Sequence, residues 1–398
     1  MDISVVRQQF PALASGFVFL ENAGGSQVPK VVADVIRDYM LESYVQLGAG
    51  YPKSDQATET VDRAHDFANV LMNGTGIGKT VLGPSTTQLC AMLADCYARN
   101  LQPGDEFIVA ENGHESNVGP WLRLQDRGAV VKMWRIDPET LAMPLESLQE
   151  LLTPRTKIVA FPHVSNILGE IADVRATSDL AHGVGARVVV DGVAFAPHQA
   201  VDVAAWDADF YGFSTYKVYG PHMAAMFGKN EAWAELNGPN HFFIPENTPY
   251  KFELGGASHE ACAGLLALER YLQVLAPGCT GRDLVVQAFG VMSGLEAPLT
   301  QRLIAALSAH PNLRILGPAT AENRVPTVGF VHATKTSREI AEAVNREGIG
   351  IRHGNMYAYR LFEALGLDPD DGAVRISAVH YNTVEEIDRV VECVYDAC

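Results

Sequence analysis

The sequence predicts an α/β protein in which helices cover both faces of a large, mostly parallel β-sheet, followed by a smaller α+β domain. The first observation behind this prediction is a series of short apolar runs between residues 79 and 214 that alternate with helix-like segments. The second is a change of pattern around 255–275, beyond which strand-like and helix-like segments follow in a different mixture. The third is the length of 398 residues, which favours two domains over one.

Six apolar runs have the composition of parallel strands that are buried on both faces. In chain order they are KTVLG (79–83), EFIVA (106–110), AVVKMW (129–134), KIVAFPHV (157–164), ARVVVDG (186–192) and ADFYGFS (208–214). Helix-like segments such as TTQLCAMLADCYARN and RATSDLAHGVG separate several of them. Ligands of such sheets bind beyond the carboxyl ends of the strands, so the residues that follow the runs are the first candidates for a site.

The later part of the chain predicts the smaller domain. It contains a helix-like LLALERYLQVL, the strand-like RVPTVGFVH and GIGIRHG, and a final helix TVEEIDRVVECVYDA. We expect an N-terminal segment (1–18) that packs with the small domain, a large domain (19–260) and a small C-terminal domain (261–398).

Composition and charge exclude several classes of function. A formal net charge of −17 disfavours binding to nucleic acid or to an anionic membrane surface, both of which favour clustered Lys and Arg. No secretory signal and no apolar run of membrane-spanning length is visible. The six cysteines are scattered without metal-ligand spacing, which favours reduced thiols and no metal site. We therefore expect a cytoplasmic protein with a small-molecule ligand and neither a nucleic-acid nor a membrane partner.

Two residues at strand ends suggest a cofactor. Asp191 closes one buried run, and Lys217 follows the next run along the chain. A buried carboxylate needs a partner. An amine for a Schiff base and a carboxylate that keeps a pyridine nitrogen protonated are the pair that pyridoxal 5′-phosphate requires. An Asp that caps the following loop and a Lys on the surface are the alternative interpretation.

A phosphate site is compatible with GPSTTQLCAM (83–92). Ser85, Thr86 and Thr87 stand where a helix begins directly after a strand, so hydroxyls and free backbone N–H groups meet there. A simple helix cap is the alternative. The nearby NGTGIGKT resembles a nucleotide-binding P-loop, but Asn73 stands where glycine is needed, and the segment precedes a strand instead of following one.

Three further polar residues follow predicted strands. His114 could stack on a flat ring or transfer protons, and Asn166 and His198 lie past two other strand ends. Each alone is a weak signal, and a loop histidine with one backbone hydrogen bond is the more common case. Their placement on the same edge of one sheet is what favours a site.

With these segments in order, the chain resembles the class V aminotransferase family, which has the type I pyridoxal phosphate fold, and within it the cysteine desulfurase and selenocysteine lyase branch. The resemblance extends over nearly the whole chain. The matching segments are FLENAGGSQVP (19–29), GPSTTQ (83–88), GHESNVGPW (113–121), HVSNILG (163–169), VVVDG…APH (188–198), FYGFSTYKVYGP (210–221) and VRISAVHYNT (374–383).

The resemblance implies a role for each matching residue. Lys217 carries the Schiff base and shuttles the Cα proton, Asp191 pairs with the pyridine nitrogen, and His114 stacks on the ring. Asn166 lies beside the ring oxygen, and Arg375 holds the substrate carboxylate as a fork. The residues implied for the phosphate are Thr86, Thr87, Ser214 and Tyr216, with Gly256 in the place of a threonine from the other subunit. Those implied for the substrate include Asn22 and Ala23 of the N-terminal loop.

The departures from the family pattern bear on the reaction. Tyr216 replaces the histidine that desulfurases have before the lysine, and Ala194 replaces a glutamine near the ring oxygen. In RHGNMYAYR (352–360), Tyr357 occupies the position of the cysteine that forms a persulfide, and no other cysteine is close in sequence. These features place the chain among cysteine desulfurase-like members and disfavour transfer of a persulfide to an acceptor protein.

The leading hypothesis is therefore a pyridoxal phosphate lyase that cleaves a C–S or C–Se bond by β-elimination from an amino acid, through an external aldimine and without a persulfide-forming cysteine. Transamination and epimerisation on the same adduct are the alternatives, and a non-catalytic scaffold is the alternative of another class. His353, Tyr357 and Tyr359 are candidates for contact with the substrate or for lining the domain interface. The resemblance also implies a homodimer with its active sites at the subunit interface.

Overall fold

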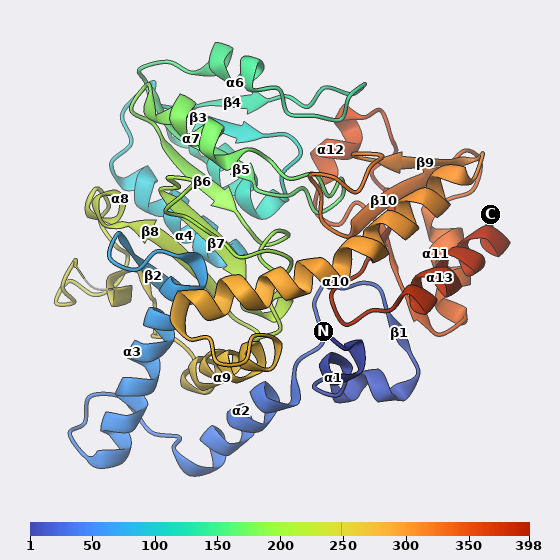
Figure 1. The fold of residues 1–398 in the computed structure, drawn as a ribbon. Coiled ribbons are helices and arrows are strands. Elements are labelled where there is room, and N and C mark those ends of the chain that lie inside the picture. The colour runs from blue at the N-terminus through green and yellow to red at the C-terminus, as the bar shows by residue number, and fades with distance from the viewer. Residues whose placement is uncertain (248) are drawn as a thin grey trace.

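A seven-stranded β-sheet organises the larger of two regions in the computed structural model, which describes residues 1–247 and 249–398 (Figure 1). Its strands are β2 (Gly78–Gly83), β3 (Glu106–Ala110), β4 (Val130–Trp134), β5 (Thr156–Pro162), β6 (Arg187–Asp191), β7 (Phe210–Ser214) and β8 (Ala224–Lys229). The spatial order is β2-β8-β7-β6-β5-β3-β4, and β8 runs antiparallel to both of its neighbours. The predicted α/β fold is confirmed, and each of the six predicted runs contains a strand. The sequence analysis missed β8, whose alanines have a weak preference for strands.

Helices cover both faces of this sheet because its strands are apolar on both sides. On β6, Val188 and Val190 point into one hydrophobic cluster and Val189 points into the cluster on the other face. The first cluster includes residues of α3 (Pro52–Met72), α7 (Val174–His182) and α9 (His259–Leu275). The second includes residues of α4 (Thr86–Arg99) and α5 (Gly119–Leu122). The remaining helices of this region are α2 (Lys30–Glu42), α6 (Leu145–Leu151) and α8 (Asn230–Ala234).

The smaller region is built on a four-stranded antiparallel sheet in the order β12-β13-β10-β9. Its elements are β9 (Leu313–Leu316), β10 (Thr327–His332), α11 (Ser337–Arg346), β12 (Arg352–Gly354), α12 (Tyr359–Ala364), β13 (Ala373–Ser377) and α13 (Val384–Ala397). A short parallel pair, β1 (Val18–Phe19) with β11 (Ile349–Gly350), ties the N-terminal part of the chain to this region. The α+β character predicted for the end of the chain is thus present.

One long helix, α10 (Gly281–Ala309), runs across both regions (Figure 1). Its first half, including Leu284 and Met292, packs in the core of the large region, and Leu299 and Leu303 pack in the core of the small region. Helix α9 also packs in the large core. Helices α9 and α10 thus both contribute to the large core, and the domain boundary predicted between 260 and 261 stays a prediction.

The N-terminal segment contacts both regions. After α1 (Ile3–Arg7), the buried Phe10 ring packs against the rings of Tyr219, Tyr271 and Tyr381, with centroid distances of 6.2, 5.2 and 4.8 Å. Segment 1–18 was expected to pack with the small domain, and the structure places it also against the large core.

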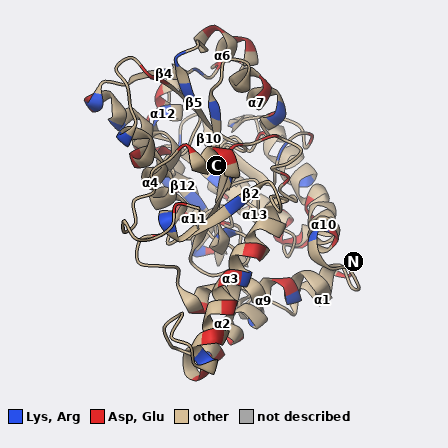
Figure 2. Cartoon of the chain, turned by 90° about the vertical axis from the view of Figure 1, so that its left-hand side faces the viewer, with Lys and Arg blue, Asp and Glu red and all other residues tan. Residues whose placement is uncertain are grey.

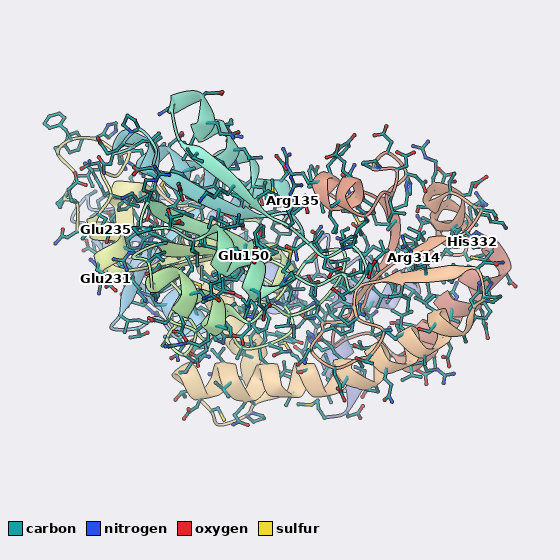
Figure 3. All side chains as sticks on the ribbon, turned by 90° about the horizontal axis from the view of Figure 1, so that it is seen from above. Arg135, Glu150, Glu231, Glu235, Arg314 and His332 are labelled. Carbon is teal, nitrogen blue, oxygen red and sulfur yellow. The ribbon has the colours of Figure 1, made fainter. Side chains whose placement is uncertain are left out.

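Charged side chains of both signs are distributed over the surface. Figure 2 shows acidic and basic residues interspersed along α2 and α3, without a continuous basic stripe there. Figure 3 places Glu231 and Glu235 at the outer end of the large region, and Arg314 and His332 in the small region. Among the described residues, no helix is long and apolar enough to cross a membrane, and no group of His, Cys, Asp and Glu is arranged to hold a metal ion.

Candidate active site

Residues from several loops meet in one cavity at the carboxyl ends of the parallel strands. The cavity has an empty volume of about 450 Å³. Eight residues singled out from the sequence line it, namely Thr86, Thr87, His114, Asn166, Asp191, Ser214, Tyr216 and Lys217. The parallel arrangement brings together residues that are far apart in the chain, as it does in other sheets of this kind.

Lys217 ends a 3₁₀ turn (Thr215–Lys217) that begins directly after β7. Its Nζ atom forms no hydrogen bond or ion pair with any residue that the structure describes. Burial and the nearby Arg375 lower the pKa of Lys217 to about 8, and Asp191 opposes that shift. A substantial fraction of this amine is therefore neutral near physiological pH, as a nucleophile or base requires.

Asp191 is the last residue of β6. The sequence left open whether it caps the following loop or belongs to a cofactor site, and its position in the structure is compatible with both roles. Its Oδ1 atom accepts a hydrogen bond of 3.0 Å from the backbone N–H of Val193, so it does cap the following loop. The residue is only 6% exposed and also lines the cavity. Burial raises the pKa of Asp191, while the Val193 bond and Lys217 lower it.

The start of α4 forms a cup of hydroxyl and backbone N–H groups. The Thr86 and Ser214 hydroxyls are 2.7 Å apart and join the ends of β2 and β7. Ser85 caps the helix by accepting a hydrogen bond from the N–H of Gln88. The N–H groups of Thr86 and Thr87 belong to the first turn of the helix and have no partner within it, which suits an anion.

His114 is held as a neutral ring. The backbone N–H of Ser116 donates to His114 Nδ1 over 3.1 Å, which places the ring proton on Nε2. Burial, followed by the charges of Lys217 and Arg375, lowers the pKa of His114 to about 4. An uncharged imidazole is suited to stacking on a flat ring.

Arg375 and Asn166 join the two regions at the cavity. Arg375 Nη1 donates to the backbone carbonyl of Asn166 over 3.1 Å, and Asn166 Nδ2 donates to the carbonyl of Met356 over 2.9 Å. Arg375 Nε and Asn166 Oδ1 are buried and have no hydrogen-bond partner within the described part of the chain. Buried polar atoms are normally paired, so these two atoms indicate where a bound group belongs. Together with the hydroxyl cup and Asp191, they fit pyridoxal phosphate and an amino acid.

Two charged residues near Arg375, namely Arg352 and Glu21, were not predicted from the sequence as site residues. Arg352 is the direct register partner of Arg375, on β12 beside β13, so the two side chains lie on the same face of the sheet. Glu21 Oε1 lies 3.0 Å from Arg352 Nη1 and 3.8 Å from Arg375 Nη2. Strand alternation in GIGIRHG could have indicated Arg352, but only its register with β13 identifies the face.

His353 does not join the cavity. Its register partner is Val374, which packs in the hydrophobic core of the small region, so His353 lies on the face opposite to Arg375. Contact between its side chain and the substrate, which we considered from the sequence, is therefore disfavoured.

Asn22 and Ala23 have a structural role in the folded chain, and their expected contact with substrate stays a prediction. Asn22 Nδ2 donates to the carbonyls of Phe19 and Ser377, and Asn22 Oδ1 accepts from the hydroxyl of Tyr381. The N–H of Ala23 donates to Ser377 Oγ over 2.8 Å. These bonds use the Asn22 amide to fasten the N-terminal loop to the end of β13.

Three further residues that the sequence suggested for the site, Gly256, Tyr216 and His198, differ in their positions relative to the cavity. Gly256 is exposed on the loop before α9 and does not line the cavity of its own chain. Tyr216 stacks on His222, with ring centroids 4.2 Å apart and an interplanar angle of 8°. His198 is paired with the buried Glu296 over 2.9 Å, which explains it as a core residue.

Tyr357, at the position of the missing cysteine, stands on a loop above His114. Its ring centroid is 5.1 Å from that of His114, and its side chain is largely exposed. Met356 and Tyr357 both have left-handed backbone, with φ of 47° and 63°. None of the six cysteines lines the cavity, and Cys90, Cys96 and Cys262 are buried in helices.

The fold and this constellation define a class, the pyridoxal phosphate-dependent enzymes of fold type I. The profile of the family described as aminotransferase class-V matches residues 18–390, and the chain belongs to this family. It is 42% identical to "Aminotransferase-like protein FGM3" of Gibberella zeae, over 98% of this chain and 96% of that protein. It is 36% identical to "Nonribosomal peptide synthetase-like enzyme fsqF" of Aspergillus fumigatus over 96% of this chain, but spans only 26% of that longer protein.

A solved structure supports the branch as well as the family. The cysteine desulfurase CsdA from Escherichia coli superposes with a TM-score of 0.84 at 28% identity, over 100% of this chain and 98% of that one. The chain is thus a cysteine desulfurase-like, pyridoxal phosphate-dependent enzyme of the class V aminotransferase family, as the resemblance in its sequence predicted.

Proposed function

We propose that the enzyme cleaves a C–S or C–Se bond of an amino acid by β-elimination and releases the sulfur or selenium without binding it to a protein cysteine. The observation that carries this proposal is Tyr357 at the position of the persulfide-forming cysteine, with its ring 5.1 Å from that of His114, together with a cavity that no cysteine lines. Arg375 Nε is buried without a hydrogen-bond partner among the described residues, which supports an α-carboxylate as the group that anchors the substrate.

The residues of the cavity suit the cofactor in defined positions. We assign the phosphate to the hydroxyls of Thr86 and Ser214 and the first turn of α4, the pyridine nitrogen to Asp191, and the ring face to His114. Tyr216 and Thr87 border the same end of the cavity. Asn166 Oδ1, which has no hydrogen-bond partner among the residues that the structure describes, suits a donor close to the ring. Lys217 Nζ is the covalent anchor of the cofactor.

Lys217 is the residue that removes the Cα proton of the substrate in this proposal. When bound, pyridoxal phosphate draws electrons from an attached amino acid and so acidifies its Cα–H bond. Lys217 Nζ, with its lowered pKa, accepts that proton. Arg375 holds the carboxylate and thereby fixes the orientation of the Cα–H bond toward Lys217. The exposed Tyr357 hydroxyl borders the solvent side, where a leaving group departs.

The test is a product analysis. The holoenzyme is incubated with cysteine, selenocysteine and alanine, and pyruvate, ammonia, sulfide or selenide, and pyridoxamine phosphate are measured. Elimination gives pyruvate, ammonia and sulfide in equal amounts, and the intact mass of the protein stays unchanged. A protein mass increased by one sulfur atom, or alanine formed from cysteine, would overturn the proposal. Lys217→Ala is the inactive control.

Transamination is a second candidate, because the relative FGM3 is named an aminotransferase-like protein. It differs from elimination in returning the proton to the cofactor instead of losing a leaving group. Accumulation of pyridoxamine phosphate in the same incubations identifies it.

We also propose that the enzyme is a homodimer. Large apolar side chains are exposed on α2 and its C-terminal loop, namely Met40, Leu41 and Tyr44, and on the loops that precede α9, namely Phe242, Phe243 and Leu254. The second group is close in sequence to Gly256, which we expect near the phosphate of the other subunit. Light scattering coupled to gel filtration distinguishes the dimer from the monomer of 43.1 kDa.

A further inference from the structure

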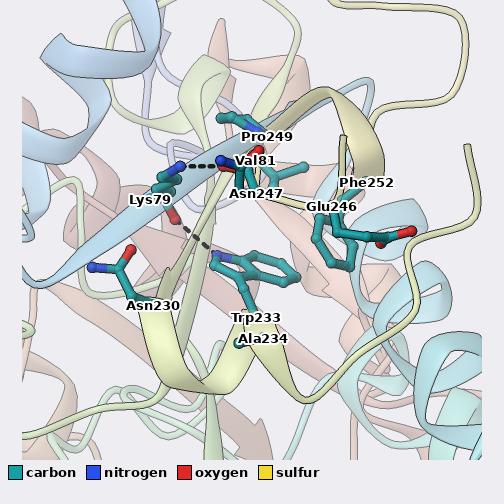
Figure 4. Close-up of a pocket in the computed structure, with 9 residues that line it drawn as sticks. All are labelled: Lys79, Val81, Asn230, Trp233, Ala234, Glu246, Asn247, Pro249 and Phe252. Carbon is teal, nitrogen blue, oxygen red and sulfur yellow. Dashed lines mark hydrogen bonds between the residues drawn. The ribbon is translucent and has the colours of Figure 1, made fainter. Parts of the chain in front are cut away.

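Two further cavities invite comparison as binding sites. The first, beside β2 and α8, is lined by Lys79, Trp233, Glu246 and Phe252 (Figure 4). Its central polar groups are already paired: Lys79 Nζ donates to the carbonyl of Asn247, and Trp233 Nε1 donates to the carbonyl of Lys79 over 3.0 Å. Such a cavity presents little unmet hydrogen-bonding capacity to a ligand.

The second cavity lies between the large sheet and the loop that precedes β10. It has a volume of about 290 Å³ and borders the candidate active site at Pro162, which lines both. Its apolar wall includes Trp134, Phe161 and Met143. The Trp134 indole N–H is already bound to the carbonyl of Pro144 and to Ser147 Oγ, so the ring contributes an apolar surface.

Two acceptor atoms in this cavity have no partner. Asn112 Nδ2 donates to Glu170 Oε1 over 2.8 Å, which leaves Asn112 Oδ1 and Glu170 Oε2 buried and unpaired within the described residues. Asn112 is only 3% exposed. Asn112 Oδ1 lacks a donor, and Glu170 Oε2 lacks one once its carboxyl group is ionised, so together they suit a ligand that supplies N–H groups.

The nearest buried cation does not meet that need. Arg324 pairs in backbone register with Glu170, but its guanidinium donates to the carbonyls of Pro318, Leu168 and Thr327. It lowers the pKa of Glu170 through its charge without forming a hydrogen bond to the carboxyl group. Glu170, which lines the cavity, therefore keeps a buried carboxyl oxygen without a hydrogen-bond partner among the described residues.

We propose that this cavity binds a small organic cation, an amidinium or primary ammonium on a short aromatic or aliphatic body. Its N–H groups donate to Asn112 Oδ1 and Glu170 Oε2, and its body packs against Trp134 and Phe161. The two N–H groups of an amidinium can donate to the two acceptor oxygens, and a flat apolar ring can pack against the aromatic side chains of the cavity. The site is separate from the cofactor and substrate positions proposed above, although Asn112 and His114 belong to the same loop.

Benzamidine is the probe, because it carries an amidinium on an aromatic ring and no carboxylate for Arg375. Titration calorimetry of the holoenzyme is expected to give a Kd between about 10 μM and 1 mM, without change in the absorbance of the cofactor. Glu170→Gln should weaken binding at least about tenfold, and uncharged benzamide should bind at least about tenfold more weakly than benzamidine. Asp173→Asn, a matched loss of a carboxylate at the exposed rim, should change Kd less than about twofold.

A second measurement needs no variant. Burial raises the pKa of Glu170 to about 8, so at lower pH the carboxyl group must release a proton to receive a cation. The other charged groups near the Glu170 carboxyl group are Arg324 and, at the rim of the cavity, Asp173. The Kd for benzamidine should therefore fall up to about tenfold per pH unit from pH 6 toward 8 and level off above. No binding at about 10 mM, a Kd independent of pH, equal affinity for benzamide, or equal losses in Glu170→Gln and Asp173→Asn would each overturn the proposal.

Discussion

Arg352 and Arg375 are register partners on β12 and β13, so their side chains lie on the same face of the small sheet, and Arg375 is bonded to the backbone of Asn166, which lines the cavity. Glu21 forms an ion pair of 3.0 Å with Arg352 and lies 3.8 Å from Arg375. Arg375 is buried, whereas Arg352 is largely exposed. The pair therefore consists of one buried, oriented cation and one solvated cation, with the carboxylate of Glu21 beside them.

Replacing Arg375 by Lys should lower kcat/KM for the amino-acid substrate about 10- to 100-fold. Lysine keeps the charge but loses the planar fork and the bond from Nη1 to the carbonyl of Asn166. Arg352→Lys is the matched control and should lower kcat/KM less than about fivefold, because its ion pair is exposed. Steady-state kinetics measure both, and equal losses would contradict the assignment of the carboxylate to Arg375.

Replacing Glu21 by Gln should lower KM about two- to fivefold with little change in kcat. The substitution keeps the shape of the side chain but removes a negative charge that competes with the substrate carboxylate for Arg375. Glu59→Gln, an exposed change on α3, is the control. A rise in KM would mean that Glu21 orients the arginines more than it offsets their charge.

The rate at which cofactor-free protein combines with pyridoxal phosphate should rise with pH up to about 8 and level off above it. Only the neutral amine of Lys217 attacks the aldehyde, and burial beside Arg375 lowers the pKa of this amine to about 8. Below that pH the protonated fraction grows, so the rate falls up to about tenfold per pH unit. Stopped-flow absorbance measures the profile, and a midpoint near 10.5, the ordinary value for lysine, would refute the effect of burial.

Thr86→Val should weaken binding of pyridoxal phosphate about tenfold. Valine has nearly the same shape but lacks the hydroxyl that lies 2.7 Å from Ser214 Oγ. Ser214→Ala should cause a similar loss, and the double variant should lose less than the sum of the two, because both side chains belong to one cup. Thr60→Val on α3, a residue that does not line the cavity, is the control. Cofactor affinity that is unchanged in both single variants would remove these hydroxyls from the phosphate site.

Tyr216→Phe separates the ring of this residue from its hydroxyl. The stack on His222, with 4.2 Å between the ring centroids, survives in the variant, so any loss of cofactor affinity belongs to the hydroxyl. We expect a Kd for pyridoxal phosphate about three- to tenfold higher, measured by equilibrium dialysis. An unchanged Kd would show that the hydroxyl does not bind the phosphate.

Local patterns predicted much of the fold and of the cavity. Apolar runs identified six strands, and the polar residues directly after them, such as Asp191 and Lys217, line one cavity because parallel strands end at the same edge. The strand β8 was missed because it runs antiparallel and begins with small residues that carry a weak strand signal. The structural role of Asn22 was not predicted because its hydrogen-bond partners Ser377 and Tyr381 lie more than 350 positions away in the chain.

The order of the elements, the family, the cofactor and the residues at the strand ends could be predicted from the sequence alone, since each of these depends on local pattern and on chain order. Features that depend on strand register and on long-range contact became visible only in the folded chain. The tertiary structure placed Arg352 instead of His353 beside Arg375, inserted Glu21 between the two arginines, and left Asn112 and Glu170 with unpaired acceptors in a shared cavity. A shift of one residue along a strand reverses the face of a side chain, and no local pattern records which partner strand sets that register.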